Sequence, residues 1–126
     1  MIVLDTSVLI DGLTGGKRSG PAIRGSLAEG EQILVPALVL FEWLRGPRLR
    51  EELAAQEALF PAISAISFGP EEAALSADLY RAVVRPRGLE IDLAIAACAI
   101  LREAPLWTLN RADFRDLPGI RLYGSR

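Results

Sequence analysis

Short, uninterrupted runs of aliphatic residues are the feature of this chain that most restricts its fold. Ile2–Leu4 forms one such run within an expected strand Met1–Thr6, and Ile33–Val35 forms a second one that ends at Pro36. Strands with apolar side chains on both faces are typical of parallel sheets that are covered on both sides. The chain is therefore expected to pack helices against both faces of a parallel sheet.

Helical patterns alternate with strand-like runs along the rest of the chain. Further strands are expected at Ala62–Phe68, at Leu106–Leu109 and, as a possible fifth, at Ile120–Tyr123. Helices are expected where apolar residues recur at helical spacing and Gly or Pro follows: Ala37–Arg45, Arg48–Leu59, Pro70–Arg85 and Asp92–Glu103. This alternation predicts an α/β fold with an open, mainly parallel sheet, formed by residues 1–126 as one domain.

The absence of histidine and the presence of one cysteine, Cys98, narrow the available chemistry. Without histidine there is no Ser–His or Cys–His nucleophile pair, no histidine general base and no zinc site that contains histidine. A lone cysteine excludes an internal disulfide, and we expect Cys98 to be a small core residue. Catalysis would therefore depend on carboxylates, on hydroxyls or on a metal ion that they hold.

Hydropathy does not indicate a membrane protein, and net charge does not indicate a particular kind of partner. The first apolar stretch has no basic residue before it and is broken at Asp5, and no later apolar run could span a bilayer. The net charge of −2, from 14 basic and 16 acidic residues, does not by itself indicate a nucleic-acid-binding protein. We expect a cytoplasmic protein whose function depends on local side chains rather than on bulk charge.

Four acidic residues that are far apart in the sequence are expected at one edge of the sheet: Asp5, Glu42, Asp92 and Asp113. Ligands of open parallel sheets bind outside the carboxyl ends of the strands, where Asp5 and Asp113 follow expected strands. Carboxylates that converge without basic partners imply a bound cation, and a site without imidazole suits Mg²⁺ or Mn²⁺. Asp5 and Asp92 are the first candidates for direct ligands, while Glu42 and Asp113 could hold a second ion or act through water.

Each acid also has a structural interpretation. Asp92 could be a helix N-cap, and Asp113 could belong to a local turn. Glu42 could pair with Arg45 on the surface of one helix. Asp5 is the hardest to explain in this way, because it ends an apolar strand with no basic residue near it in the sequence.

Four segments resemble, in order and spacing, the conserved blocks of PIN-domain ribonucleases, and most closely the VapC-type toxins of toxin–antitoxin pairs. They cover essentially the whole chain: IVLDTSVLID, VPALVLFEWLRG, GLEIDLAIAACAI and LWTLNRADFRDLPGIRLY. No block is specific alone, but four of them in this order make a strong signal. One departure is Ser7, where many members carry Asn, and a serine hydroxyl can still orient a metal-bound water.

The resemblance implies a three-layer α/β/α sandwich with a mainly parallel sheet of four or five strands. It places the invariant acids of the family at Asp5, Glu42 and Asp92, and the usual fourth acidic position at Asp113. It also implies an endoribonuclease that depends on Mg²⁺ or Mn²⁺, forms a homodimer and is inhibited by a cognate VapB-like antitoxin. Such an ion lowers the pKa of a bound water and stabilises charge on phosphate oxygens.

Polar and basic residues are expected to support such a site. Neutral hydrogen-bonding side chains occur near the same strand ends: Thr6, Ser7, Thr108 and Asn110. For Thr108, ordinary turn bonding is an equally good interpretation. Candidate contacts to RNA phosphates follow the first strand or surround the end of the long helix: Lys17, Arg18, Arg24, Arg81, Arg85 and Arg87.

An antitoxin helix would need an apolar groove. Leu49, Leu53, Leu59 and Phe60 could form one, although the same residues could instead cover the sheet. Trp43 is expected to be packed in the interior or to lie at a partner interface.

Two other functions fit parts of the pattern. A phosphoryl-accepting domain also has acids at strand ends, but Asp5-Thr6-Ser7 lacks the second Asp, and Lys17 is the single lysine. A catalytically silent PIN scaffold that binds RNA or a protein partner without cleavage is the alternative. Loss of one acid would favour this alternative, and all four are present.

Overall fold

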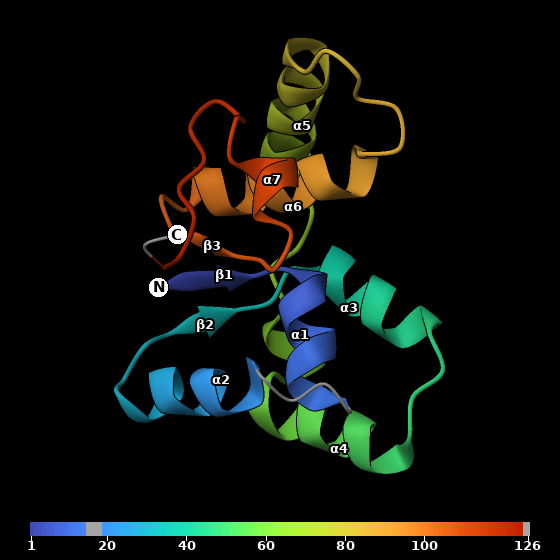
Figure 1. The fold of residues 1–126 in the computed structure, drawn as a ribbon. Helices are drawn as coiled ribbons and strands as arrows, with labels where there is room; N and C mark the ends of the chain where they lie inside the picture. Colours follow the sequence, from blue (N-terminus) through green and yellow to red (C-terminus); the bar gives the residue numbers. More distant parts are fainter. Residues whose placement is uncertain (15–18, 125–126) are drawn as a thin grey trace.

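The computed structural model describes residues 1–14 and 19–124, which form a small sheet surrounded by helices (Figure 1). The strands are β1 (Ile2–Leu4), β2 (Ile33–Leu34) and β3 (Leu106–Trp107). The α-helices are α1 (Thr6–Leu13), α2 (Ser19–Ala28), α3 (Ala37–Arg45), α4 (Arg50–Leu59), α5 (Pro70–Ala82), α6 (Glu90–Leu101) and α7 (Arg111–Phe114). A 3₁₀ helix covers Ala62–Ser64.

The strands pair in parallel in the order β2-β1-β3. Ile2 of β1 lies opposite Ile33 of β2, and Leu4 of β1 lies opposite Trp107 of β3. Since parallel strands require long crossover connections, each connection contains helices. The carboxyl ends of all three strands therefore meet at one edge, as the sequence predicts.

Helices cover both faces of this sheet. Figure 1 shows α1, α2 and α4 on one side, α5, α6 and α7 on the other, and α3 beside the carboxyl ends of the strands. The predicted three-layer α/β/α arrangement is confirmed. No helix in the described part of the chain is long and apolar enough to cross a membrane.

The sheet is narrower than the predicted four or five strands. Of the expected third strand, Ile66 alone pairs, in a parallel bridge with Pro36. Of the expected fifth strand, Leu122 alone pairs, in a parallel bridge with Leu106. The bridge is made by the N–H of Ile66 with the carbonyl of Val35 and by the N–H of Ala37 with the carbonyl of Ile66. Because α3 begins at Ala37 and the third segment forms a 3₁₀ helix just before Ile66, the two segments meet at one point.

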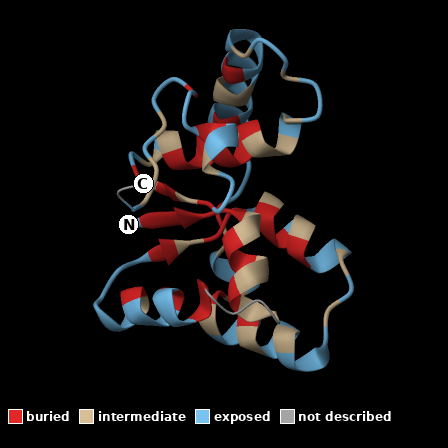
Figure 2. Cartoon of the chain, in the orientation of Figure 1, coloured by how far each residue is buried: buried red, intermediate tan, exposed pale blue. Residues whose placement is uncertain are grey.

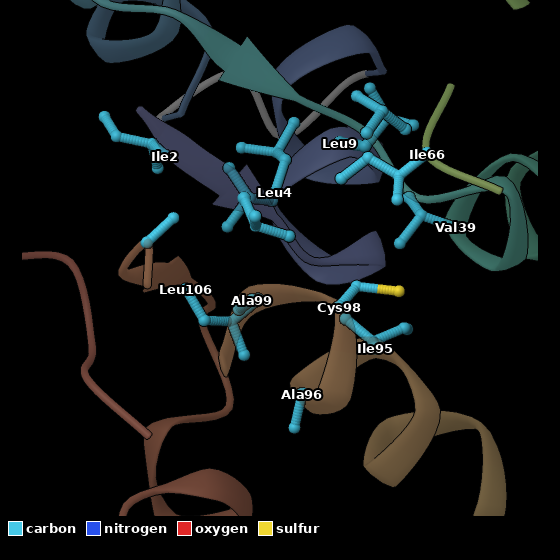
Figure 3. Close-up of a cluster of buried hydrophobic side chains, with 14 of the residues drawn as sticks. Ile2, Leu4, Leu9, Val39, Ile66, Ile95, Ala96, Cys98, Ala99 and Leu106 are labelled. Carbon is cyan, nitrogen blue, oxygen red and sulfur yellow. The ribbon is translucent and has the colours of Figure 1, made fainter. Parts of the chain in front are cut away.

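The core is centred on β1. Figure 2 shows β1 entirely buried, and Ile2, Val3 and Leu4 are each at most 1% exposed. α6 contributes a continuous buried run, Leu93–Ala99, whose alanines let the helix backbone approach the sheet closely. Figure 3 shows side chains of β1, α1, α3 and α6 meeting here, with Cys98 among them as predicted.

The structure has three α-helices that the sequence pattern did not predict: α1, α2 and the short α7. α2 contains Gly20, Pro21 and Gly25, which normally oppose helix formation. Pro21 lies in the first turn of α2, where its missing N–H group is not needed. Packing of α2 against α1 therefore outweighs a poor local helix propensity.

This packing predicts opposite effects of two alanine substitutions in α2. A Cβ atom at Gly20 would lie 2.9 Å from the carbonyl oxygen of Gly12, whereas one at Gly25 meets no atom within 4 Å. Gly20→Ala is expected to lower the free energy of unfolding by about 1–3 kcal/mol because the helices must separate. Gly25→Ala should raise it by up to about 1 kcal/mol. Urea denaturation measures both, and equal effects would contradict this packing.

Candidate active site

Three of the predicted acids line one cleft at the carboxyl ends of the strands. Asp5 follows β1, Glu42 lies on α3 and Asp92 lies in the first turn of α6, and the cleft has a volume of about 400 Å³. Figure 1 shows α3 and the starts of α1 and α6 around the end of β1. The other lining residues are Thr6, Ser7, Ile10, Arg45, Gly46 and Asn110.

The Asp5 carboxylate is buried and held on one side. Its Oδ2 atom accepts hydrogen bonds from the hydroxyls of Ser7 at 2.9 Å and Thr108 at 2.7 Å. These hydroxyls accept hydrogen bonds in turn from the backbone N–H groups of Leu109 and Asn110, at 3.0 and 2.9 Å. Asp5 is also the N-cap residue of α1, but its side chain does not cap the helix. Its Oδ1 atom receives no hydrogen bond from the described residues and is left for a ligand.

The Glu42 carboxylate has a partner on each oxygen. Thr6 Oγ1 donates a hydrogen bond to Oε1 at 2.5 Å, and Arg45 Nη2 lies 3.4 Å from Oε2. The pairing of Glu42 with Arg45 along one helix is therefore present, as the sequence suggested. The Arg45 guanidinium also lies 5.2 Å from the centre of the Phe41 ring.

Asp92 is the acid that its surroundings perturb most. Burial raises its pKa to about 6, and the negative charges of Asp5, Glu42 and Asp113 add to the shift. Burial and these charges both oppose the positive end of the α6 dipole, which by itself would favour the ionised form. The N-cap interpretation of Asp92 is wrong, because α6 begins at Glu90 after an N-cap at Leu89. Asp92 thus faces three other carboxylates with no hydrogen-bond donor among the described residues.

Asp113 lies at the rim rather than in the cleft lining. It is exposed on the four-residue helix α7, and its backbone N–H bonds to the carbonyl of Asn110 at 3.0 Å. The local turn that the sequence suggested is therefore present, while the charge of Asp113 still reaches Asp92. For Thr108, the supporting role at the site and the ordinary turn bonding are both present. Its hydroxyl donates a hydrogen bond to Asp5 and accepts one from the backbone N–H of Asn110.

The chemistry of the donors fits a hard cation that keeps some of its water. Asp5 Oδ1 and the Asp92 carboxylate offer oxygen atoms without competing donors in the described part of the chain, and no imidazole is present. Within the described ranges, no three acidic or cysteine side chains lie close enough to enclose an ion directly. Mg²⁺ commonly binds one or two carboxylates and completes its shell with water. The arrangement therefore suits Mg²⁺ or Mn²⁺ rather than a dehydrated cage.

The described members of the predicted RNA-contacting set lie outside the lining of this cleft. Four of them are exposed side chains elsewhere: Arg24, Arg81, Arg85 and Arg87. Lys17 and Arg18 lie outside the described residues. Arg45 was not predicted as a cleft residue, only as a surface partner of Glu42 on one helix. Its position three residues after Glu42, which puts both on the same face of the helix, was the signal that could have placed it in the cleft.

The predicted apolar groove is divided between surface and core. Leu49 and Leu53 are 63% and 38% exposed, whereas Phe60 is buried and Leu59 is partly buried. Trp43 is fully buried, with the Arg48 guanidinium 4.2 Å from the centre of its ring, so packing in the interior is the correct interpretation. Two of the four groove residues therefore stay available on the surface.

Comparison with known proteins agrees with this geometry. The Ribonuclease VapC19 of Mycobacterium tuberculosis is 33% identical over 123 residues, which cover 96% of this chain and 98% of that protein. The VapBC2 structure from Rickettsia felis, bound to a DNA fragment from its promoter, matches over 100% of both chains with a TM-score of 0.76 and 22% identity. A toxin–antitoxin complex from Klebsiella pneumoniae matches over 95% of both chains with a TM-score of 0.74 and 24% identity. Residues 2–120 match the family model described as PIN domain, and the chain therefore belongs to the PIN domain family.

Proposed function

We propose that this protein is a metal-dependent endoribonuclease and the toxin of a toxin–antitoxin pair. The observation that carries this proposal is the position of Asp92, half-buried beside three other acids and without a basic partner among the described residues. Burying like charges together is costly unless a cation joins them. The relative named as a ribonuclease and the toxin–antitoxin structures support the same function.

The acids have distinct roles in this proposal. Asp5 and Asp92 are the direct ligands of Mg²⁺ or Mn²⁺, while Glu42 and Asp113 hold a second ion or act through water. When bound, the ion supplies an activated water and stabilises negative charge on the scissile phosphate.

The hydroxyl residues position these acids. Ser7 and Thr108 fix the orientation of Asp5, and the 2.5 Å hydrogen bond from Thr6 fixes one oxygen of Glu42. Asn110 lines the cleft and can donate its side-chain amide to the substrate. The chain thus holds the Asp5 and Glu42 carboxylates in place before the ion and the RNA arrive.

The partners follow from the same proposal. Leu49 and Leu53 are the exposed apolar residues that an amphipathic helix of a VapB-like antitoxin would cover. We place the protein in the cytoplasm as a homodimer, with the exposed Arg24, Arg81, Arg85 and Arg87 available to RNA phosphates. The catalytically silent scaffold is not favoured, since all four acids are present and three of them share one cleft.

Metal removal tests the enzyme. Purified protein is expected to cleave RNA in Mg²⁺ or Mn²⁺ and to fall to the level of the enzyme-free control in EDTA. Adding back either ion should restore cleavage, because the ion supplies the activated water. Cleavage that persists after chelation would contradict the proposed metal chemistry.

Induced expression tests the toxin role and separates it from the silent scaffold. The chain would be expressed with and without the gene next to its own, and new RNA 5′ ends would be mapped in both cultures. New ends are expected when the chain is expressed alone and should disappear when an antitoxin gene accompanies it. Absence of new ends would favour a protein that binds RNA or a partner without cutting.

A further inference from the structure

Arg45 lines the cleft, but the proposed metal chemistry of the acids gives this basic residue no role. We propose that Arg45 leaves Glu42 when the cleft is loaded and binds the phosphate of the substrate, so that it exchanges one anion for another. This inference rests on the proposed nuclease function and deepens it.

The first argument is charge. Among the described residues that line the cleft, three are carboxylates, Asp5, Glu42 and Asp92, and one is basic, Arg45. One divalent ion offsets two of the three negative charges, so an RNA phosphate would still meet a negative cleft without Arg45. The guanidinium offsets the third charge and forms strong charge-assisted hydrogen bonds with phosphate oxygens.

The second argument is that Arg45 is loosely held. Among the described residues its one ion pair, to Glu42, is long at 3.4 Å, and the Arg45 side chain is 55% exposed. The stacking on Phe41 at 5.2 Å is also at the surface, since Phe41 is 51% exposed. Exposed ion pairs of this kind contribute little to stability, because water and salt screen them. Release of Arg45 is therefore inexpensive, and its long side chain can turn into the cleft.

The third argument is that Glu42 does not depend on Arg45 for its position. Thr6 holds Oε1 at 2.5 Å, whereas Arg45 contacts Oε2. When Arg45 leaves, Oε2 becomes free and the carboxylate stays in place. A metal ion and Arg45 therefore compete for Glu42, while a phosphate and Glu42 compete for Arg45, so that metal and RNA should assist each other's binding.

This exchange predicts that one substitution changes two affinities in opposite directions. Arg45→Met keeps the length of the side chain and removes its charge. It is expected to bind Mn²⁺ about two- to fivefold more tightly without RNA, because the competing ion pair is lost. It should bind a single-stranded RNA about tenfold more weakly, and the slope of log affinity against log salt should fall by about 0.7, the value for one lost phosphate contact.

The measurements are Mn²⁺ titration calorimetry on the metal-free protein, and fluorescence anisotropy of a labelled RNA in EDTA at several salt concentrations. Arg121→Met is the matched control, since Arg121 is exposed at the amino end of β3, where its carbonyl bonds to Leu106. Arg45→Lys, which keeps the charge but loses the planar fork, should lie between wild type and Arg45→Met.

The outcomes separate this inference from the proposed function. If wild-type protein neither binds Mn²⁺ nor cleaves RNA, the nuclease proposal fails. If wild-type protein does both and Arg45→Met behaves like Arg121→Met in both titrations, the exchange alone is overturned. Weaker Mn²⁺ binding by Arg45→Met would also overturn it, because a structural role predicts losses in both titrations.

Discussion

Replacing Asp5 by asparagine is expected to abolish metal-dependent RNA cleavage while the chain stays folded. The amide oxygen of asparagine can take the place of Oδ2 and still accept the hydroxyls of Ser7 and Thr108. The amide NH₂ group then occupies the place of Oδ1, where a donor faces the cation instead of a lone pair. The expected loss of turnover exceeds the roughly 10- to 100-fold effects that are usual for residues that only support a metal ligand.

Single-turnover cleavage in saturating Mg²⁺ measures this loss, and urea denaturation without metal tests the fold. Asp116→Asn is the matched control, because this substitution makes the same chemical change at an exposed residue outside the cleft lining. The control should cleave at the wild-type rate. Near-wild-type turnover by pure Asp5→Asn protein would show that Asp5 is not a metal ligand and would contradict the proposed chemistry.

The convergence of the acids was predictable because parallel strands end at a common edge. Asp5 directly follows a short apolar run, and Glu42 lies on a helix whose ends are set by Pro36 and Gly46. That helix, α3, has the bounds that the sequence predicts, since its start and stop signals are local. Local signals therefore placed two of the acids, and sheet topology brought them together.

Features that depend on contacts between distant segments were not predictable. α2 forms despite two glycines and a proline because Gly20 packs closely on α1, and no pattern within α2 records that contact. The expected strands near Ile66 and Leu122 are single bridges because their pairing depends on neighbours at the sheet edge. The rim position of Asp113 likewise depends on how α7 turns away after β3.

Substitution of Asp92 by asparagine is expected to stabilise the metal-free protein at neutral pH while it removes activity. The pKa of Asp92 is raised from 3.8 to about 6 in the folded chain, by burial first and then by the charges of Asp5, Glu42 and Asp113. Between these two values the folded state binds more protons than the unfolded state. The free energy of unfolding therefore falls as the pH rises from about 4 to 6, and the full cost is present at pH 7.

Asparagine carries no charge at any of these pH values and avoids this cost. After a discount for the half-exposed position of Asp92, the gain at pH 7 should be on the order of 1–2 kcal/mol. Urea denaturation in EDTA at several pH values should show a difference between variant and wild type that is small near pH 4 and constant above about pH 7. Asp116→Asn, whose carboxylate is exposed, should show no such rise.

In saturating Mg²⁺ the wild-type protein should be more stable than the variant. An ion that binds the folded state stabilises it, and the variant lacks one of the two direct ligands for that ion. Greater stability of wild-type protein at pH 7 in EDTA would contradict the electrostatic origin of the shift. An unchanged order in Mg²⁺ would instead contradict the role of Asp92 as a ligand. The two measurements thus distinguish a carboxylate that lowers the stability of the metal-free fold and binds a cation from one that lies near other acids without binding a cation.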